Sequence, residues 1–282
     1  MIEFTRRVFG GRVCAGLIGF VAAMAALPAL GCGFIAPPIE ETRTSQIAHV
    51  AGSGLKVETG NGAIKLTADA AEKDVTVVAK LKAQTPERMA ATKVFAERTP
   101  DGTLSIYVKW PDDHRESNEG CGFEIRMPDV KGLTLATSNG AITVSGSTGA
   151  AELTSSNGAV QVNGHNGDLR VKTSNGAVTC HDVNGAADLD SSNGAVTCGL
   201  ASSAAGPVAI DTSNGAVTLE VGGAFAGTMS VKTSNGSVTL PGGPNVNVQR
   251  KSKGSATLSF GQGGKDSKIH SSNGSVTVRV RD

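Results

Sequence analysis

The chain has 282 residues, with 26 basic and 25 acidic side chains, 37 glycines, and only 8 Phe, 1 Trp and 1 Tyr. This nearly neutral balance gives no support to nucleic-acid binding, which requires a strongly basic surface. The hydrophobic fraction of 39% is enough for a core. Because large rings are scarce, that core must consist of Val, Ile, Leu and Ala, a composition that favours layered β-structure.

Residues 1–31 are typical of an export signal. Three arginines stand near the start, and an apolar run follows from Val13 to Leu30. The run ends in Ala29-Leu30-Gly31-Cys32, a sequence of small residues before a cysteine that resembles a bacterial lipobox. We therefore expect Cys32 to carry the lipid and the protein to be anchored to a membrane of the cell envelope. Plain cleavage, or retention of the run as a membrane anchor, is the alternative.

The segment after the signal, residues 32–50, contains Pro37 and Pro38 and is expected to be an extended tether. Residues 51–130 form a different region, with strands expected over 55–58, 75–81, 104–110 and 123–127 and a short helix over 86–97. We expect this region to cap the β-structure that follows, because an exposed sheet edge is prone to aggregation.

Residues 131–282 are built from a repeat of Ser-Asn-Gly followed by Ala or Ser and then Val or Ile. The repeat is marked by seven asparagines, spaced 18, 18, 18, 21, 21 and 38 residues apart: Asn139, Asn157, Asn175, Asn193, Asn214, Asn235 and Asn273. A related unit at Ser252-Lys253-Gly254 divides the last gap and makes eight units. Gly60-Asn61-Gly62 resembles an isolated ninth unit.

Each unit has two short segments in which apolar and polar residues alternate, one before and one after the turn. The apolar positions four before and three after each Asn, such as Val171 and Val178, are predicted to be core. Asn-Gly also favours a two-residue hairpin, so an antiparallel hairpin meander remains an alternative. The meander would need a cover for its apolar face, and the sequence offers no helix for it. We therefore favour an all-β fold, a single-stranded parallel β-helix or solenoid of about eight rungs with an N-terminal β-rich cap.

In this fold the stacked asparagines are expected to form a hydrogen-bonded ladder, with each following glycine at a positive φ. Turn geometry accounts for both residue types, so no binding site is assigned to them. Cys180 and Cys198 fall in the same inward column one rung apart, and either a disulfide or two buried thiols would fit.

The order of a lipoprotein-type signal, the strand Phe123–Pro128 and the repeats that begin with Leu133–Val144 resembles the bacterial putative-adhesin family of β-strand-repeat proteins. The resemblance covers most of residues 50–282. It implies an exported parallel β-helix, and it supplies no catalytic residues.

The chemistry-bearing residues do not converge in the sequence. The outward positions before the turns carry mixed charges, including Asp188 and Asp190, and a solvated charged face explains them better than a carboxylate pair does. The acidic loop at residues 112–119 fits no calcium-loop spacing. His49, His165, His181 and His270 have no shared nucleophile arrangement. We expect no enzyme activity, cofactor or metal site.

After the turns, the outward positions carry no charge and contain hydroxyl groups. This candidate binding face is represented by Thr143, Thr179, Thr197, Thr218 and Thr239. We therefore expect a non-enzymatic, lipid-anchored envelope protein that presents a repetitive surface for adhesion or for binding a glycan or protein. A signalling or envelope-stress accessory with a protein partner, and a glycan-active enzyme, are the other hypotheses.

Overall fold

The computed structural model describes residues 5–7, 38–242 and 246–281. The expected signal, including Cys32, therefore lies almost wholly outside the described residues. The fold is all-β, with a single short helix, α1 (Pro86–Ala91), and a 3-10 turn at Pro111–Asp113 within the described part. Helix α1 begins after the cap Thr85 and ends before Thr92, earlier than expected, because Lys93–Arg98 is a strand.

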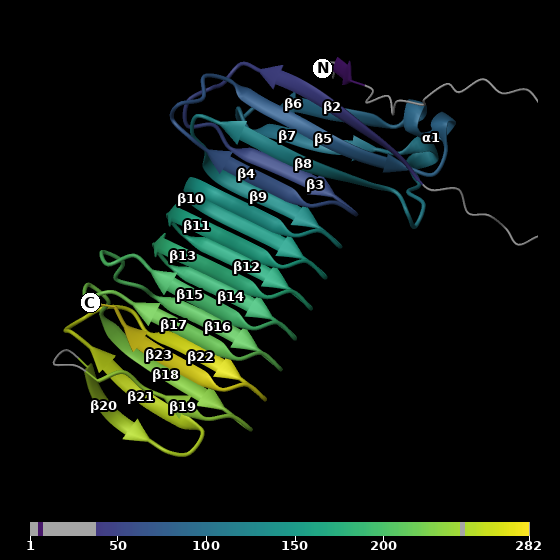
Figure 1. Ribbon diagram of the computed structural model, residues 1–282. Coiled ribbons are helices and arrows are strands. Elements are labelled where there is room, and N and C mark those ends of the chain that lie inside the picture. The colour runs from purple at the N-terminus through teal and green to yellow at the C-terminus, as the bar shows by residue number, and fades with distance from the viewer. Residues whose placement is uncertain (1–4, 8–37, 243–245, 282) are drawn as a thin grey trace, which may run out of the picture.

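Each repeat contributes two strands, and equivalent strands of neighbouring repeats pair in parallel and in register. Val160 is opposite Val178, and Leu169 is opposite Ala187. This pairing confirms the solenoid and excludes the hairpin meander. The chain crosses one face, turns at Asn-Gly and returns along the other face, so that the two faces enclose one apolar core (Figure 1).

The strand that precedes each turn belongs to the first face, which we call the charged face. In spatial order its strands are β6 (Lys93–Arg98), β7 (Leu104–Lys109), β3 (Leu55–Thr59), β9 (Lys131–Thr137), the end of β10 (Ile142–Ser155), β12 (Leu169–Thr173), β14 (Ala187–Ser191), β16 (Val208–Thr212), β22 (Ser267–Ser271), β18 (Gly227–Thr233), β21 (Ser255–Phe260) and β20 (Val246–Lys251).

The strand that follows each turn belongs to the second face, which we call the threonine face. Its strands are β1 (Thr5–Arg7), β2 (Ile39–Ile47), β5 (Val75–Ala83), β8 (Gly120–Met127), β4 (Ile64–Ala68), the start of β10, β11 (Val160–Asn166), β13 (Val178–Asn184), β15 (Val196–Leu200), β17 (Val217–Val221), β23 (Val276–Val280) and β19 (Val238–Thr239).

The predicted core columns are inside. Val171 and Val178 are both fully buried, and their equivalents along the stack are buried as well. Within the described residues no helix covers the repeat rungs, because each face covers the other; the short α1 packs against β5 and β2 and buries Met89 there. The apolar residues between the two faces are mostly Val, Leu and Ile, as the shortage of aromatic residues predicted.

The amino-terminal part differs from the expected tether and cap in two respects. Residues 39–47, expected within the tether, form β2 and pair with all nine residues of β5, because Ser45 and Ile47 turn inward and are buried. Residues 55–68 supply β3 and β4, which pair in parallel with β9 and β10. The isolated Asn61 unit is therefore a rung of the same stack.

The carboxyl-terminal part departs from the chain order of the repeats. The last rung, β22 and β23, lies between β16/β17 and β18/β19, so that Asn273 stands between Asn214 and Asn235. Figure 1 shows these yellow strands between green ones. The unit at Lys253 was expected to be a rung because of its similarity to the repeat, but it is not one. It lies in an antiparallel hairpin, β20–β21, that pairs with β18 at the end of the stack.

Candidate functional site

The turn at each rung is held by two rows of hydrogen bonds. In the first row, each Asn side chain donates to the Asn of the neighbouring rung, for example Asn175 Nδ2 to Asn157 Oδ1 at 2.7 Å. The row runs from Asn61, through Asn139 and Asn273, to Asn235. These amides are engaged with one another, which agrees with assigning them no ligand.

The second row was not predicted. A buried Ser or Thr two positions before each Asn from Asn139 onward accepts from the N–H of its own turn glycine and donates to the glycine carbonyl of the neighbouring rung. For Ser191 these distances are 2.9 Å from Gly194 N and 3.1 Å to Gly176 O. The signal was in the sequence as the invariable hydroxyl before Ser-Asn-Gly: Thr137, Ser155, Thr173, Ser191, Thr212, Thr233 and Ser271.

The turn glycines are required for a reason other than the expected positive φ. Gly176 and its equivalents do not have a positive φ. A Cβ atom on Gly176 would instead overlap the carbonyl oxygen of Gly158 in the neighbouring rung. Close stacking of the backbones, not turn strain, therefore demands glycine.

A third set of hydroxyls points outward from the threonine face and forms what we call the threonine row. It consists of the five predicted residues and Thr277, which the inserted last rung places between Thr218 and Thr239. Thr179, Thr197, Thr218, Thr277 and Thr239 stand on five consecutive rungs, and Gln161 separates them from Thr143. Within residues 38–242 and 246–281, none of the six hydroxyls hydrogen-bonds to another residue.

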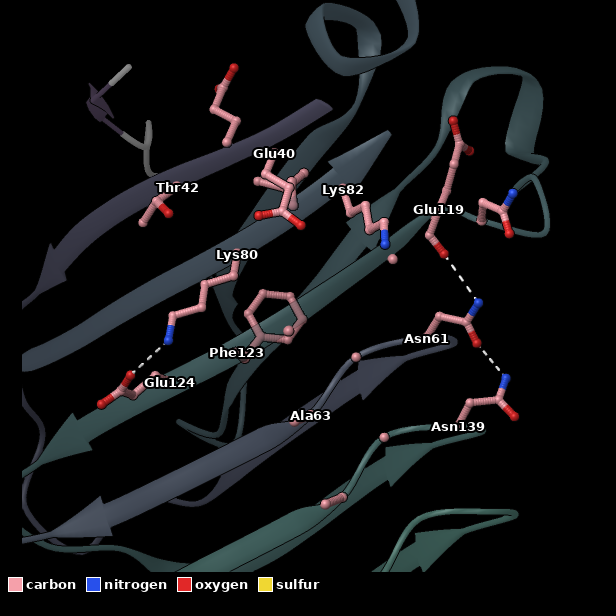
Figure 2. Close-up of a pocket in the computed structure, with 18 of the residues that line it drawn as sticks. Glu40, Thr42, Asn61, Ala63, Lys80, Lys82, Glu119, Phe123, Glu124 and Asn139 are labelled. Atoms are coloured by element: carbon pink, nitrogen blue, oxygen red, sulfur yellow. Dashed lines mark hydrogen bonds and ion pairs between the residues drawn. The ribbon is translucent and has the colours of Figure 1, made fainter. Parts of the chain in front are cut away.

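At one end of the threonine row lies a concave surface of about 1110 Å³. We call it the lysine trough, because Lys65, Lys80 and Lys82 are among the residues that line it. Thr143 is opposite Lys65, and Lys65 is opposite Glu124 on β8. Glycines of the turns and of β8 contribute to its wall. Figure 2 shows Lys80 directed at Glu124, to which its Nζ lies 3.3 Å away. This hydrogen bond lowers the pKa of Glu124.

One wall of the lysine trough is fixed by the loop that precedes β8. Asn61 Nδ2 donates to the carbonyl of Glu119, so the loop closes the end of the asparagine row (Figure 2). The Glu119 carboxylate is fully buried and accepts from Arg88 Nε at 2.6 Å and Nη2 at 2.8 Å. The hydrogen bond from Arg88 lowers the pKa of Glu119. An acidic side chain of the 112–119 loop is thus used for structure.

The charged face carries the mixed signs that the sequence predicted. Arg170 Nε lies 3.6 Å from Asp188 Oδ2, and His270 Nδ1 lies 3.3 Å from Asp211 Oδ2. A groove of about 930 Å³ crosses the rungs at the start of these strands and contains Asp188. In the described ranges no group of three or more His, Cys, Asp or Glu residues could hold a metal ion.

Two pairs of reactive side chains on adjacent rungs are buried in the core. His165 Nδ1 lies 2.8 Å from Ser147 Oγ, a contact that the sequence did not reveal; both residues are buried, and Nε2 faces the carbonyl of Asp168 at 3.3 Å. Cys180 and Cys198 are opposite each other and are free, buried thiols. Burial raises the pKa of both, to about 12 for Cys198.

No helix in the described part of the chain is long and apolar enough to cross a membrane. Residues 55–279 match the family model described as Toastrack DUF4097. Two solved structures are similar: a putative adhesin from Bacteroides fragilis, at 14% identity and a TM-score of 0.42, and a putative cell adhesion protein from Clostridium sporogenes, at 14% identity and a TM-score of 0.30. The first match covers 86% of this chain and 97% of that chain, and the second 86% and 100%. No curated protein matches.

Proposed function

The chain belongs to the Toastrack DUF4097 family of β-strand-repeat proteins, and from this premise we propose that it is a non-enzymatic adhesion or binding protein of the cell envelope whose ligand docks on the threonine row. A hydroxyl-rich glycan is the ligand class that we favour. The observation that carries the proposal is the contrast between two sets of hydroxyls. Those two positions before the repeat asparagines have both a donor and an acceptor, and those of the threonine row have neither among the residues that the structure describes.

The chemistry of the threonine row supports a glycan over a protein. Each free Thr hydroxyl can donate one hydrogen bond and accept two, which suits a ligand made of hydroxyls. Rungs stack about 4.8 Å apart, so the row offers such a group at regular intervals along the stack. Protein interfaces are rich in Tyr, Trp, Met and Arg. The outward columns two and four positions after the turn asparagines contain none of these residue types.

The test is binding by the chain from residue 33 onward to a glycan array and to envelope extracts, beside the variant Thr179→Lys/Thr197→Lys/Thr218→Lys. The control places the same three charges on the opposite face, as Thr134→Lys/Thr154→Lys/Ser230→Lys, at exposed positions. Circular dichroism first establishes that all three proteins fold. We expect glycans to bind the parent and the control but not the first variant.

Other outcomes lead to the alternative hypotheses. Loss of binding only in the control would move the site to the groove of the charged face. Capture of one defined protein, with no glycan bound, would favour a signalling or envelope-stress accessory. Turnover of a bound glycan, abolished by Asp188→Asn or Asp190→Asn, would contradict the non-enzymatic role.

Export and lipidation belong to the same proposal and rest on the sequence of residues 1–32. Cells that express the full chain are labelled with a radioactive fatty acid, and the label is expected on the parent and not on a Cys32→Ala variant. A labelled Cys32→Ala protein would contradict lipidation at Cys32. An unlabelled parent that fractionates with the membrane would favour retention of the apolar run as an anchor.

A further inference from the structure

The last rung occupies a place between two rungs that precede it in the chain. We call residues 267–281 the C-terminal rung and the space between β16/β17 and β18/β19 the slot. Ile269 of this rung is opposite Ile210 on one side and Val231 on the other, and Val276 is opposite Val217 and Val238. Ile269 and Val276 are fully buried.

The slot recognises its occupant by the same hydrogen bonds that join any two rungs. Asn273 donates to Asn214 and accepts from Asn235, both at 2.7 Å, and Ser271 Oγ donates to Gly215 O at 2.9 Å. A Cβ on Gly274 would overlap Gly215 O. The slot therefore selects a strand-turn-strand segment with a hydroxyl, an Asn and a Gly at these three positions.

A single exposed linker joins the C-terminal rung to the rest of the chain. Residues 261–266 are all exposed, and Gly261, Gly263 and Gly264 have positive φ values. The linker passes from β21, on one side of β18, to β22 on its other side. None of the slot's contacts described above involves the linker, so they do not depend on which chain supplies the rung.

We propose that the slot is a strand-accepting site and that a second copy of this chain can fill it with its own C-terminal rung, giving a dimer by reciprocal exchange. Exchange of a terminal element through a hinge loop is a low-cost route to dimers. In dilute solution the chain's own rung prevails, because a short linker gives an effective concentration of the order of millimolar. When the linker is too short for the chain's own rung to reach the slot, the rung of a second copy fills the slot instead.

The test shortens the linker in the full chain by deleting residues 261–264. The two residues that remain span about 10 Å at full extension. That is about two strand spacings in a straight line, a path that β18 itself blocks. We expect a folded protein with the mass of a dimer by light scattering and with the circular dichroism spectrum of the parent. A folded monomer would overturn the proposal.

A synthetic peptide of residues 266–281 provides the matched control. Excess peptide should convert the dimer into monomers that each carry one peptide, and the same peptide with Gly274→Val should not. If the shortened chain fails to fold, refolding of the parent decides, with labelled peptide at concentrations above the roughly millimolar effective concentration of the chain's own rung, so that the peptide can compete. Uptake is expected to exceed that of the Gly274→Val peptide by at least about tenfold, or about 1.4 kcal/mol. Equal uptake, or none, would refute the strand-accepting slot.

Discussion

The hydroxyl groups of this protein have different roles according to their distance from the turn asparagine. Two positions before it, the hydroxyl is buried and joins two rungs; four positions after it, the hydroxyl faces outward and has no partner within the described residues. The same residue types thus form internal hydrogen bonds on one side of the turn and an open polar row on the other. This distinction leads to the first of three predictions for single residues.

Replacing Ser191 with Ala should lower the free energy of unfolding by about 1–3 kcal/mol, because Gly194 N and Gly176 O would be left buried without their partner. Ser230→Ala is the matched control, since Ser230 is exposed on β18. Its effect should stay within about 0.5 kcal/mol. Urea unfolding measures both values. Equal effects would show that the buried hydroxyl row does not stabilise the stack.

Replacing Gly176 with Ala should cost at least about 2 kcal/mol, because the added Cβ would overlap the backbone of the neighbouring rung, which cannot move without separating the strands. Gly223→Ala is the control: a Cβ there would meet no atom within 4 Å. The same urea measurement applies. A tolerated Gly176→Ala would contradict close backbone stacking as the reason for the turn glycine.

Protonation of His165 should destabilise the fold. Burial lowers the pKa of His165, so the unfolded chain binds the proton more readily than the folded one. The contribution of His165 is therefore complete above the unfolded pKa of about 6.5 and is lost as the pH falls toward its folded pKa. Unfolding free energies of the parent and of His165→Gln at pH 7.5 and pH 5.5 isolate this effect. A parent that loses no more stability than the variant would contradict it.

At the scale of elements, the ion pair of Arg88 with Glu119 joins α1 to the loop that closes the asparagine row. The carboxylate also accepts from the backbone N–H of Glu116 at 3.0 Å, so the pair fixes the path of the loop. The lysine trough therefore depends on one buried charge and its partner.

Removal of that partner alone should be costly. Arg88→Met leaves the Glu119 carboxylate buried and unpaired, and it is expected to lower the unfolding free energy by about 3–5 kcal/mol. The double variant Arg88→Met/Glu119→Gln should recover part of the loss, because no buried charge remains. Thermal and urea unfolding compare the variants. A double variant that is no more stable than the single one would show that the ion pair does not act through the buried charge.

The elements also show how far the sequence predicts this fold. Period-two alternation around Asn-Gly predicted the core columns, and the lack of a helix to cover them favoured parallel rungs over a meander, because stacked rungs bury residues such as Val171 and Val178 without a cover. The repeat pattern could not predict that Asn273 lies before Asn235 in the stack, because every rung offers its neighbours the same hydroxyl, Asn and Gly contacts. Lys253 was misplaced for a related reason: its unit keeps the alternation of a rung, and alternation is shared by antiparallel hairpins.

The site was predictable to a similar extent. The column of threonines follows directly from the repeat, whereas the lysine trough brings together β5, β8 and the turn at Asn61, which are distant in sequence. Pairing between such segments leaves no local signal. The buried Ser147–His165 contact was missed because the two residues lie on adjacent rungs, 18 residues apart.

At the scale of the whole molecule, the stack has two unlike faces, and its carboxyl-terminal end is protected against pairing with other sheets. Strand β19 has only two residues and is followed by Pro241, and the outermost strand β20 carries Arg250 and Lys251. Short strands, proline and exposed charge prevent edge-to-edge aggregation. The uncharged threonine row therefore faces outward on a stack whose carboxyl-terminal end does not readily extend the sheet.

The most direct test of the account compares the affinity of a glycan identified with the parent for the two lysine triples. Both variants add three positive charges at strand positions, one set in the threonine row and the other on the charged face. We predict that Thr179→Lys/Thr197→Lys/Thr218→Lys loses at least about tenfold in affinity, equivalent to about 1.4 kcal/mol, and that Thr134→Lys/Thr154→Lys/Ser230→Lys keeps the affinity of the parent. Unchanged binding by the first variant would contradict the threonine row as the binding surface.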